Sequence, residues 1–210
     1  MNRRAIFLAL AVLALVFTVG CVGSALKRPP VEKRYFDLEV QRAGTQAPKS
    51  GAPVLAVRRV QVSPRYEGRE LVYRTGPSGF ASDYYNLFFV PPSQMLTQDL
   101  RQWLDRSGLF ARVLDAGSLV RPDLTLESNA AVFCGDYSEK PGKAVVEMQF
   151  LLLDEGDPGM AMLFSRDYRR EVAVAGAEPK DLVAALRQAV AAIYADLEKD
   201  LGSLSLKARD

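Results

Sequence analysis

Few side chains in this 210-residue chain can do acid–base or nucleophilic chemistry. It contains no His, so it lacks the commonest proton shuttle near neutral pH and cannot build a Ser-His-Asp triad. Ser78 lies between Gly76 and Gly79 without the spacing of a nucleophile elbow. The sequence also lacks the glycine patterns that cradle phosphates in nucleotide-binding proteins. We therefore expect that the protein is not an enzyme.

The clearest acidic group is Asp154, Glu155 and Asp157, in a stretch that also holds Gly156 and Gly159. Neighbouring carboxylates could serve acid–base catalysis or bind Ca²⁺ through oxygen. The spacing does not fit an EF-hand loop, and the Glu that would complete one is missing. We interpret the stretch as a solvated turn, and we expect no metal and no cofactor.

One cysteine has the setting of a modification site. Arg3 and Arg4 precede an apolar run, residues 5–19, and the small residues around Gly20 lead directly to Cys21. This arrangement resembles a signal peptide with the lipobox of bacterial lipoproteins, in which the Cys becomes the lipidated first residue. We predict a signal peptide over residues 1–20 and lipidation of Cys21, with the chain held at a membrane by that lipid.

An uncleaved anchor is the alternative, because residues 5–26 form a nearly uncharged stretch of 22 residues, long enough to span a bilayer. Residues 21–34 are polar and contain two prolines, which is typical of a flexible tether. Lipidation of Cys21 would leave Cys134 without a disulfide partner. Cys134 follows an apolar run, so we expect it to be buried.

The charge balance excludes a general nucleic-acid binder. The chain has 27 basic and 25 acidic residues. Removal of residues 1–20 takes away Arg3 and Arg4 and leaves 25 of each. A nucleic-acid-binding protein would show a basic excess.

Two amphipathic helices are predicted. Ser93 is a candidate N-cap for the first, whose apolar residues recur at helical spacing until Gly108. Pro179 fits the first position of the second. Its apolar stripe steps by three or four residues through Leu182, Leu186, Val190, Ile193, Leu197 and Leu201.

Runs with strand character alternate with these helices. The predicted strands cover residues 35–40, 54–62, 70–74, 83–90, 110–114, 123–133, 144–154 and 162–174. This order predicts a single α+β domain over residues 35–203, with a mixed, mainly antiparallel sheet and both helices packed on one of its faces.

An unusual concentration of aromatic side chains precedes the first helix. Tyr84, Tyr85, Phe88 and Phe89 fall within six residues, and strict alternation would put aromatic rings on both faces of the strand. One interpretation is a central strand covered on both faces. The other is an apolar surface that contacts a lipid or a partner protein.

At these residues the chain resembles the ABC-type transport auxiliary lipoprotein family. The shared marks are Tyr35-Phe36-Asp37-Leu38, the segments 55–60, 69–74, 86–91 and 123–126, and the terminal amphipathic helix. None of these motifs is catalytic. The resemblance covers residue 35 to about residue 201, which is nearly the whole chain after the tether.

The resemblance implies a non-enzymatic accessory subunit of an Mce-type ABC system that moves lipids between the inner and outer membranes. The expected partners are the Mce-domain protein with its permease and ATPase. Phospholipid and a second copy of the chain are further candidates. The expected location is the periplasmic face of the outer membrane, favoured over the inner membrane because Val22, not Asp, follows Cys21. The alternative is a structural outer-membrane lipoprotein or assembly factor that handles no lipid.

Overall fold

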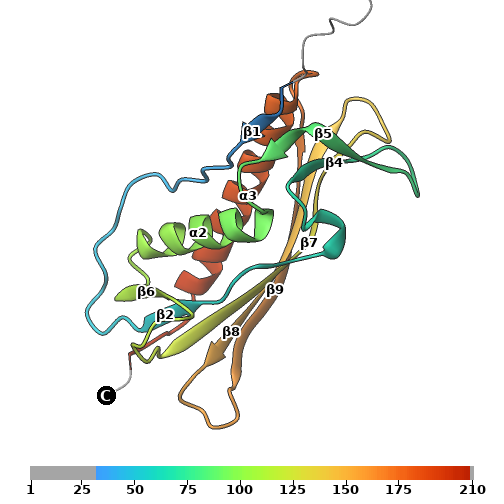
Figure 1. Cartoon of the computed structure of the whole chain (residues 1–210). Coiled ribbons are helices and arrows are strands. Elements are labelled where there is room, and N and C mark those ends of the chain that lie inside the picture. Colours follow the sequence, from blue (N-terminus) through green and yellow to red (C-terminus); the bar gives the residue numbers. More distant parts are fainter. Residues whose placement is uncertain (1–31, 209–210) are drawn as a thin grey trace, which may run out of the picture. The chain divides into compact units, whose positions relative to one another are not determined.

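A computed structural model describes residues 32–208 and shows a curved sheet with two long helices on one face (Figure 1). From Lys33 onward the described residues belong to one compact unit. They form a nine-stranded sheet whose central strand is β7 (Leu124–Asp136). In the described part, no helix is long and apolar enough to cross a membrane.

One edge of β7 begins a long antiparallel meander. It pairs with β8 (Lys143–Asp154), which pairs in turn with β9 (Met162–Ala173). From Ala144 to Leu152 every second residue of β8 is completely buried, and the residues between them, such as Glu147 and Gln149, lie on the opposite face. This period-two pattern is expected when one face of a strand lies against a core.

The other edge of β7 is covered by three short strands in succession. These are β2 (Val54–Val57), β3 (Gln61–Val62) and β4 (Glu70–Arg74), and all three run parallel to β7. The predicted strand over residues 54–62 is therefore interrupted. The turn η1 (Pro64–Tyr66) connects β3 to β4.

Three further strands extend this side of the sheet. Strand β6 (Arg112–Asp115) pairs with β2. Strand β5 (Phe80–Phe88) pairs with β4, and β1 (Arg34–Phe36) pairs with β5. The long pairings are antiparallel and the short ones parallel, so the prediction of a mixed, mainly antiparallel α+β sheet is confirmed.

Helix α3 (Pro179–Gly202) begins as the sequence predicts, with Pro179 in its first turn and a capping box between Glu178 and Asp181. Helix α2 (Pro92–Asp105) differs at its start, because Pro91 is the N-cap and Ser93 lies inside the helix. The prediction of Ser93 as N-cap was wrong. Pro92 is the first residue of the helix. Proline fits this position because the N–H group that it lacks would have had no partner within the helix.

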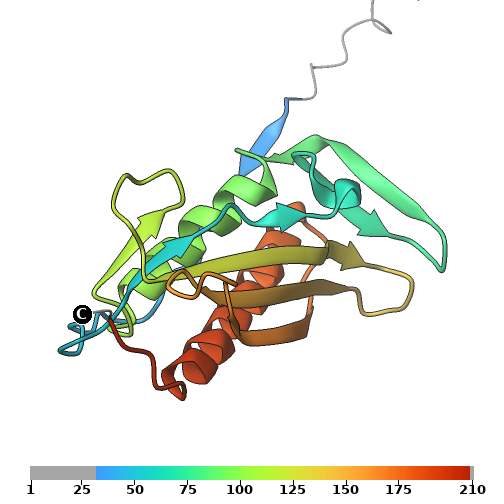
Figure 2. The same cartoon turned by 90° about the horizontal axis from the view of Figure 1, so that it is seen from below.

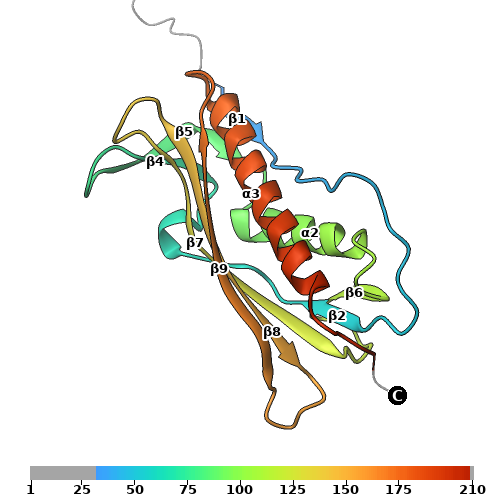
Figure 3. The ribbon, with the colours of Figure 1, turned by 180° about the vertical axis from the view of Figure 1, so that it is seen from behind.

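Both helices pack on the same face of the sheet, as Figures 2 and 3 show from two further directions. The predicted apolar stripe of α3 is completely buried. Tyr194 of α3 donates its hydroxyl to the carbonyl of Leu96 in α2, at 3.0 Å. Trp103 of α2 donates to Glu198 of α3 at 2.8 Å, and Arg42 also binds that carboxylate.

Strand β9 shows which face of the sheet carries the helices. Arg166 and Tyr168 both bind Asp200 of α3, and Arg170 binds Asp196. Residues between them, such as Arg169, therefore lie on the other face. We call this the outer face; it carries neither α2 nor α3.

Candidate functional site

Strands β1 and β5, with the residue that follows β5, carry exposed aromatic rings. Tyr84 is 66% exposed and Phe89 is 63% exposed, with Tyr35 and Tyr85 also exposed. Tyr84 and Tyr85 form an edge-on ring pair with centroids 5.1 Å apart, and Tyr35 and Phe89 form a second pair at 6.4 Å. We call these four residues the aromatic surface.

An irregularity in β5 places Tyr84 and Tyr85 at the surface. Between the pairs Glu70–Leu87 and Val72–Ser82, β5 advances five residues while β4 advances two. The extra residues leave the regular ladder, so the side chains no longer alternate between faces as in an ideal strand. This explains why two neighbouring tyrosines are both exposed.

Asp83 fixes the shape of this bulge. Its carboxylate accepts hydrogen bonds from the backbone N–H groups of Tyr85 and Asn86, both at 3.0 Å. The hydroxyl of Tyr73 and the side-chain amide of Asn86 donate to its other oxygen, at 2.9 and 2.8 Å. Burial opposes the charged form of Asp83, but the hydrogen bonds from Asn86, Tyr85 and Tyr73 outweigh it and lower its pKa.

Two cations border the aromatic surface. The ammonium of Lys33 lies 4.2 Å from the centre of the Tyr84 ring, and the guanidinium of Arg69 lies 5.2 Å from that of Tyr35. Arg69 also donates to the carbonyl of Phe88 at 3.0 Å. Exposed rings flanked by cations are typical of surfaces that meet a partner or a lipid headgroup region.

Phe88 is not part of this surface. It is only 2% exposed, and its ring packs against Phe133 of β7 with centroids 5.6 Å apart. The hypothesis that Phe88 belongs with Tyr84, Tyr85 and Phe89 in one contact face therefore fails on position. Tyr35 takes its place. The sequence did not indicate that Tyr35 belongs to the contact surface. It comes close to Phe89 because β1 pairs in parallel with β5, and the paired residues are 52 positions apart in the chain.

A pocket of about 480 Å³ lies on the outer face, where η1 and the β4–β5 hairpin meet β7, β8 and β9. Its walls combine apolar and cationic side chains. The apolar part comes mainly from Tyr66, Phe80, Val132, Cys134 and Val145, and the charged part from Arg65, Arg74, Asp136 and Arg169. We call it the arginine pocket.

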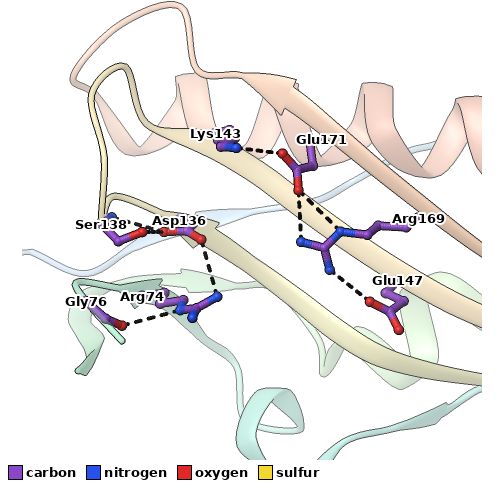
Figure 4. Close-up of polar contacts among 8 residues, drawn as sticks. All are labelled: Arg74, Gly76, Asp136, Ser138, Lys143, Glu147, Arg169 and Glu171. Atoms are coloured by element: carbon purple, nitrogen blue, oxygen red, sulfur yellow. Dashed lines mark hydrogen bonds and ion pairs between the residues drawn. The ribbon is translucent and has the colours of Figure 1, made fainter. Parts of the chain in front are cut away.

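Most charges around the arginine pocket are paired (Figure 4). Arg74 lies 3.6 Å from Asp136, whose pKa is lowered by hydrogen bonds from Ser138 and by the charge of Arg74. Arg169 lies 2.9 Å from both Glu147 and Glu171.

Glu171 also binds Lys143 at 2.6 Å, and its hydrogen bonds with Lys143 and Arg169 lower its pKa. Asp136 and Glu171 are therefore ionised at neutral pH and neutralise the cations that they contact.

The family model for the ABC-type transport auxiliary lipoprotein component matches residues 36–198. The chain belongs to this family.

Solved structures agree with the fold of this auxiliary lipoprotein. A crystal structure of protein XCC0632 from Xanthomonas campestris aligns with a TM-score of 0.65 at 18% identity, covering 79% of this chain and 92% of the other. A second crystal structure, of an uncharacterized protein, aligns with a TM-score of 0.64 at 22% identity, covering 81% and 99%. A comparison with curated proteins finds no match.

The candidate catalytic groups of the auxiliary lipoprotein have structural roles. Asp154 and Asp157 accept hydrogen bonds from the turn's own backbone, at Gly156 and Gly159, both at 2.7 Å. Glu155 accepts one from Thr125. Within residues 32–208, no group of three or more Cys, Asp or Glu side chains is placed to hold a metal ion.

Of the two cysteines, only Cys134 lies within the described residues. Cys134 is buried as predicted, at 2% exposure, and burial raises the pKa of its thiol, so it stays protonated. Cys21 and the predicted signal peptide lie outside the described residues. Lipidation of Cys21 remains a prediction.

Proposed function

We propose that this protein is a non-enzymatic lipoprotein subunit of an Mce-type ABC transport system that moves lipids between the inner and outer membranes. Cys21 would carry the lipid anchor at the periplasmic face of the outer membrane, and residues 21–34 would tether the folded domain over residues 35–203. Family membership supports a role beside an ABC transporter. The Mce partner, the lipid cargo and the choice of membrane belong to the proposal.

The observation that carries the proposal is the aromatic surface. Four exposed rings on one corner of the sheet are costly to leave in water and suit a partner that covers them. Lys33 borders this corner, so the described chain begins beside it. We infer that Tyr35, Tyr84, Tyr85 and Phe89 contact the Mce-domain protein.

The test is co-purification from membranes in mild detergent, followed by mass spectrometry. Wild-type full-length protein should recover an Mce-domain protein with its permease and ATPase. A variant carrying Tyr84→Ser, Tyr85→Ser and Phe89→Ser should lose them while keeping its own fold and membrane attachment. The matched control is Leu119→Ser with Val120→Ser, because both residues are exposed apolar side chains in the 116–123 loop.

Other results of the co-purification and of the variants would contradict parts of the proposal. Recovery of outer-membrane assembly proteins without an Mce subunit would replace the proposal with the structural alternative. Equal recovery with the triple variant would remove the aromatic surface from the interface. Replacement of Cys21 by Ser should release the protein from membranes; retention in the membrane fraction would favour an uncleaved anchor.

A further inference from the structure

Arg65 is the one arginine of the arginine pocket whose charge is not matched by an ion pair within residues 32–208. Its guanidinium lies 4.9 Å from the centre of the Phe80 ring and 6.0 Å from that of Tyr66. Stacking on a ring uses the face of a guanidinium and leaves most of the N–H edge available.

The charges around the pocket favour an anion. The pocket-lining residues contribute three guanidinium groups against the single carboxylate of Asp136. When the outer ion-pair partners Lys143, Glu147 and Glu171 are added, four cations face three carboxylates. Arg65, the lining arginine without an ion pair among the described residues, belongs to the short turn η1.

The volume and the lining residues of the pocket indicate which class of anion fits it. A space of about 480 Å³ accommodates a group much larger than a single halide or carboxylate. Arginine matches the tetrahedral oxygens of phosphate through paired N–H donors. Val132, Val145 and Phe80 supply apolar contacts for carbon atoms next to such a group.

We propose that the arginine pocket binds a phosphate-bearing group, with Arg65 as its primary contact and Arg74 and Arg169 at its flanks. The source is either free phosphate or the phosphodiester headgroup of a lipid. The proposal concerns the outer face of the sheet, so it does not depend on the aromatic surface or on the partner inferred for it.

The test is isothermal titration calorimetry of the full-length chain in dodecyl maltoside micelles, which contain no phosphate. The two probes are inorganic phosphate and glycerophosphoglycerol, the soluble headgroup of an anionic phospholipid. Saturable binding of inorganic phosphate alone would indicate a free-phosphate site, and binding of the diester would indicate a lipid headgroup site. Absence of saturable binding with both probes would overturn the proposal.

Variants test whether binding occurs at this pocket. Arg65→Gln should weaken binding at least tenfold, because one charge-assisted contact is lost. Arg166→Gln is the matched control: it removes an arginine from β9 that faces α3 and pairs with Asp200, and binding should stay within twofold. Unchanged affinity in Arg65→Gln would overturn the assignment.

A second variant at the same position separates a loss of binding from a loss of folding. Arg65→Lys keeps the charge but loses the fork of donors, so its affinity should fall between wild type and Arg65→Gln. Equal affinities for Arg65→Lys and Arg65→Gln, with both folded by circular dichroism, would contradict a role for the charge of Arg65. Raising the NaCl concentration should weaken binding to wild type more than to Arg65→Gln.

Discussion

Asp99 should make the protein less stable as the pH rises through the mildly acidic range. This residue of α2 is 7% exposed, and its carboxylate accepts a hydrogen bond from the backbone N–H of Val40 at 3.1 Å. Burial raises its pKa from 3.8 to about 6, with the nearby charges of Asp37 and Glu39 acting in the same direction. The Val40 bond and the charge of Arg187 oppose this shift.

The sign of the change in unfolding free energy with pH follows from how many protons the folded and unfolded states bind. Between pH 4 and 6 the folded state holds a proton on Asp99 that the unfolded chain has released, so the free energy of unfolding falls as the pH rises. The difference between 3.8 and about 6 corresponds to about 3 kcal/mol. Partial screening by solvent lowers the expected effect to about 2 kcal/mol.

Asp99→Asn tests this reasoning, because an amide can accept the Val40 hydrogen bond but does not titrate. The variant should be about 2 kcal/mol more stable than wild type at pH 7.5 and nearly equal to it at pH 4. Urea unfolding of the full-length chain, followed through Trp103 fluorescence, measures both. Asp167→Asn, at an exposed position on β9, is the matched control for removing one carboxylate. A stability difference independent of pH would refute the reasoning.

Three further predictions concern packing. Phe88→Ala should cost about 3–5 kcal/mol of unfolding free energy in a denaturant titration, whereas Phe89→Ala should change it by less than about 0.5 kcal/mol, since only Phe88 is buried. Gly108→Ala should lower the melting temperature, because Gly108 has φ +73° and an added Cβ would lie 2.9 Å from the carbonyl oxygen of Ala47; an unchanged value would contradict the strain. Glu198→Ala should lower the free energy of unfolding by about 2–3 kcal/mol, because it removes the acceptor of the Trp103 indole N–H and the ion-pair partner of Arg42. A loss below about 0.5 kcal/mol in a denaturant titration would show that both groups find other partners.

Local patterns in the sequence predict the elements whose packing is regular. The apolar steps of α3 and the alternation of β8 each define one buried face, and the structure confirms both. Phe88 could not be placed this way, because the bulge at Asp83 breaks the alternation of β5 before that residue. Nothing in the spacing of β4 and β5 announces that mismatch.

The two candidate surfaces depend on long-range pairing to different degrees. Tyr84, Tyr85 and Phe89 form a local cluster that composition alone can detect. The arginine pocket unites Arg65, Arg74 and Arg169 from three separate segments, and its location follows only from the register of β4 and β9 with the central strands. Each arginine taken alone has the pattern of an ordinary surface residue.

The position of β7 has a consequence for the order of folding. Strands β7, β8 and β9 and helix α3 are consecutive in the chain, so their contacts close short loops and can form early. The strands β2, β3 and β4 precede them, and each pairs along one edge with β7. Whenever the chain emerges with its N-terminus first, the edges of β2, β3 and β4 that face β7 stay unpaired until β7 follows.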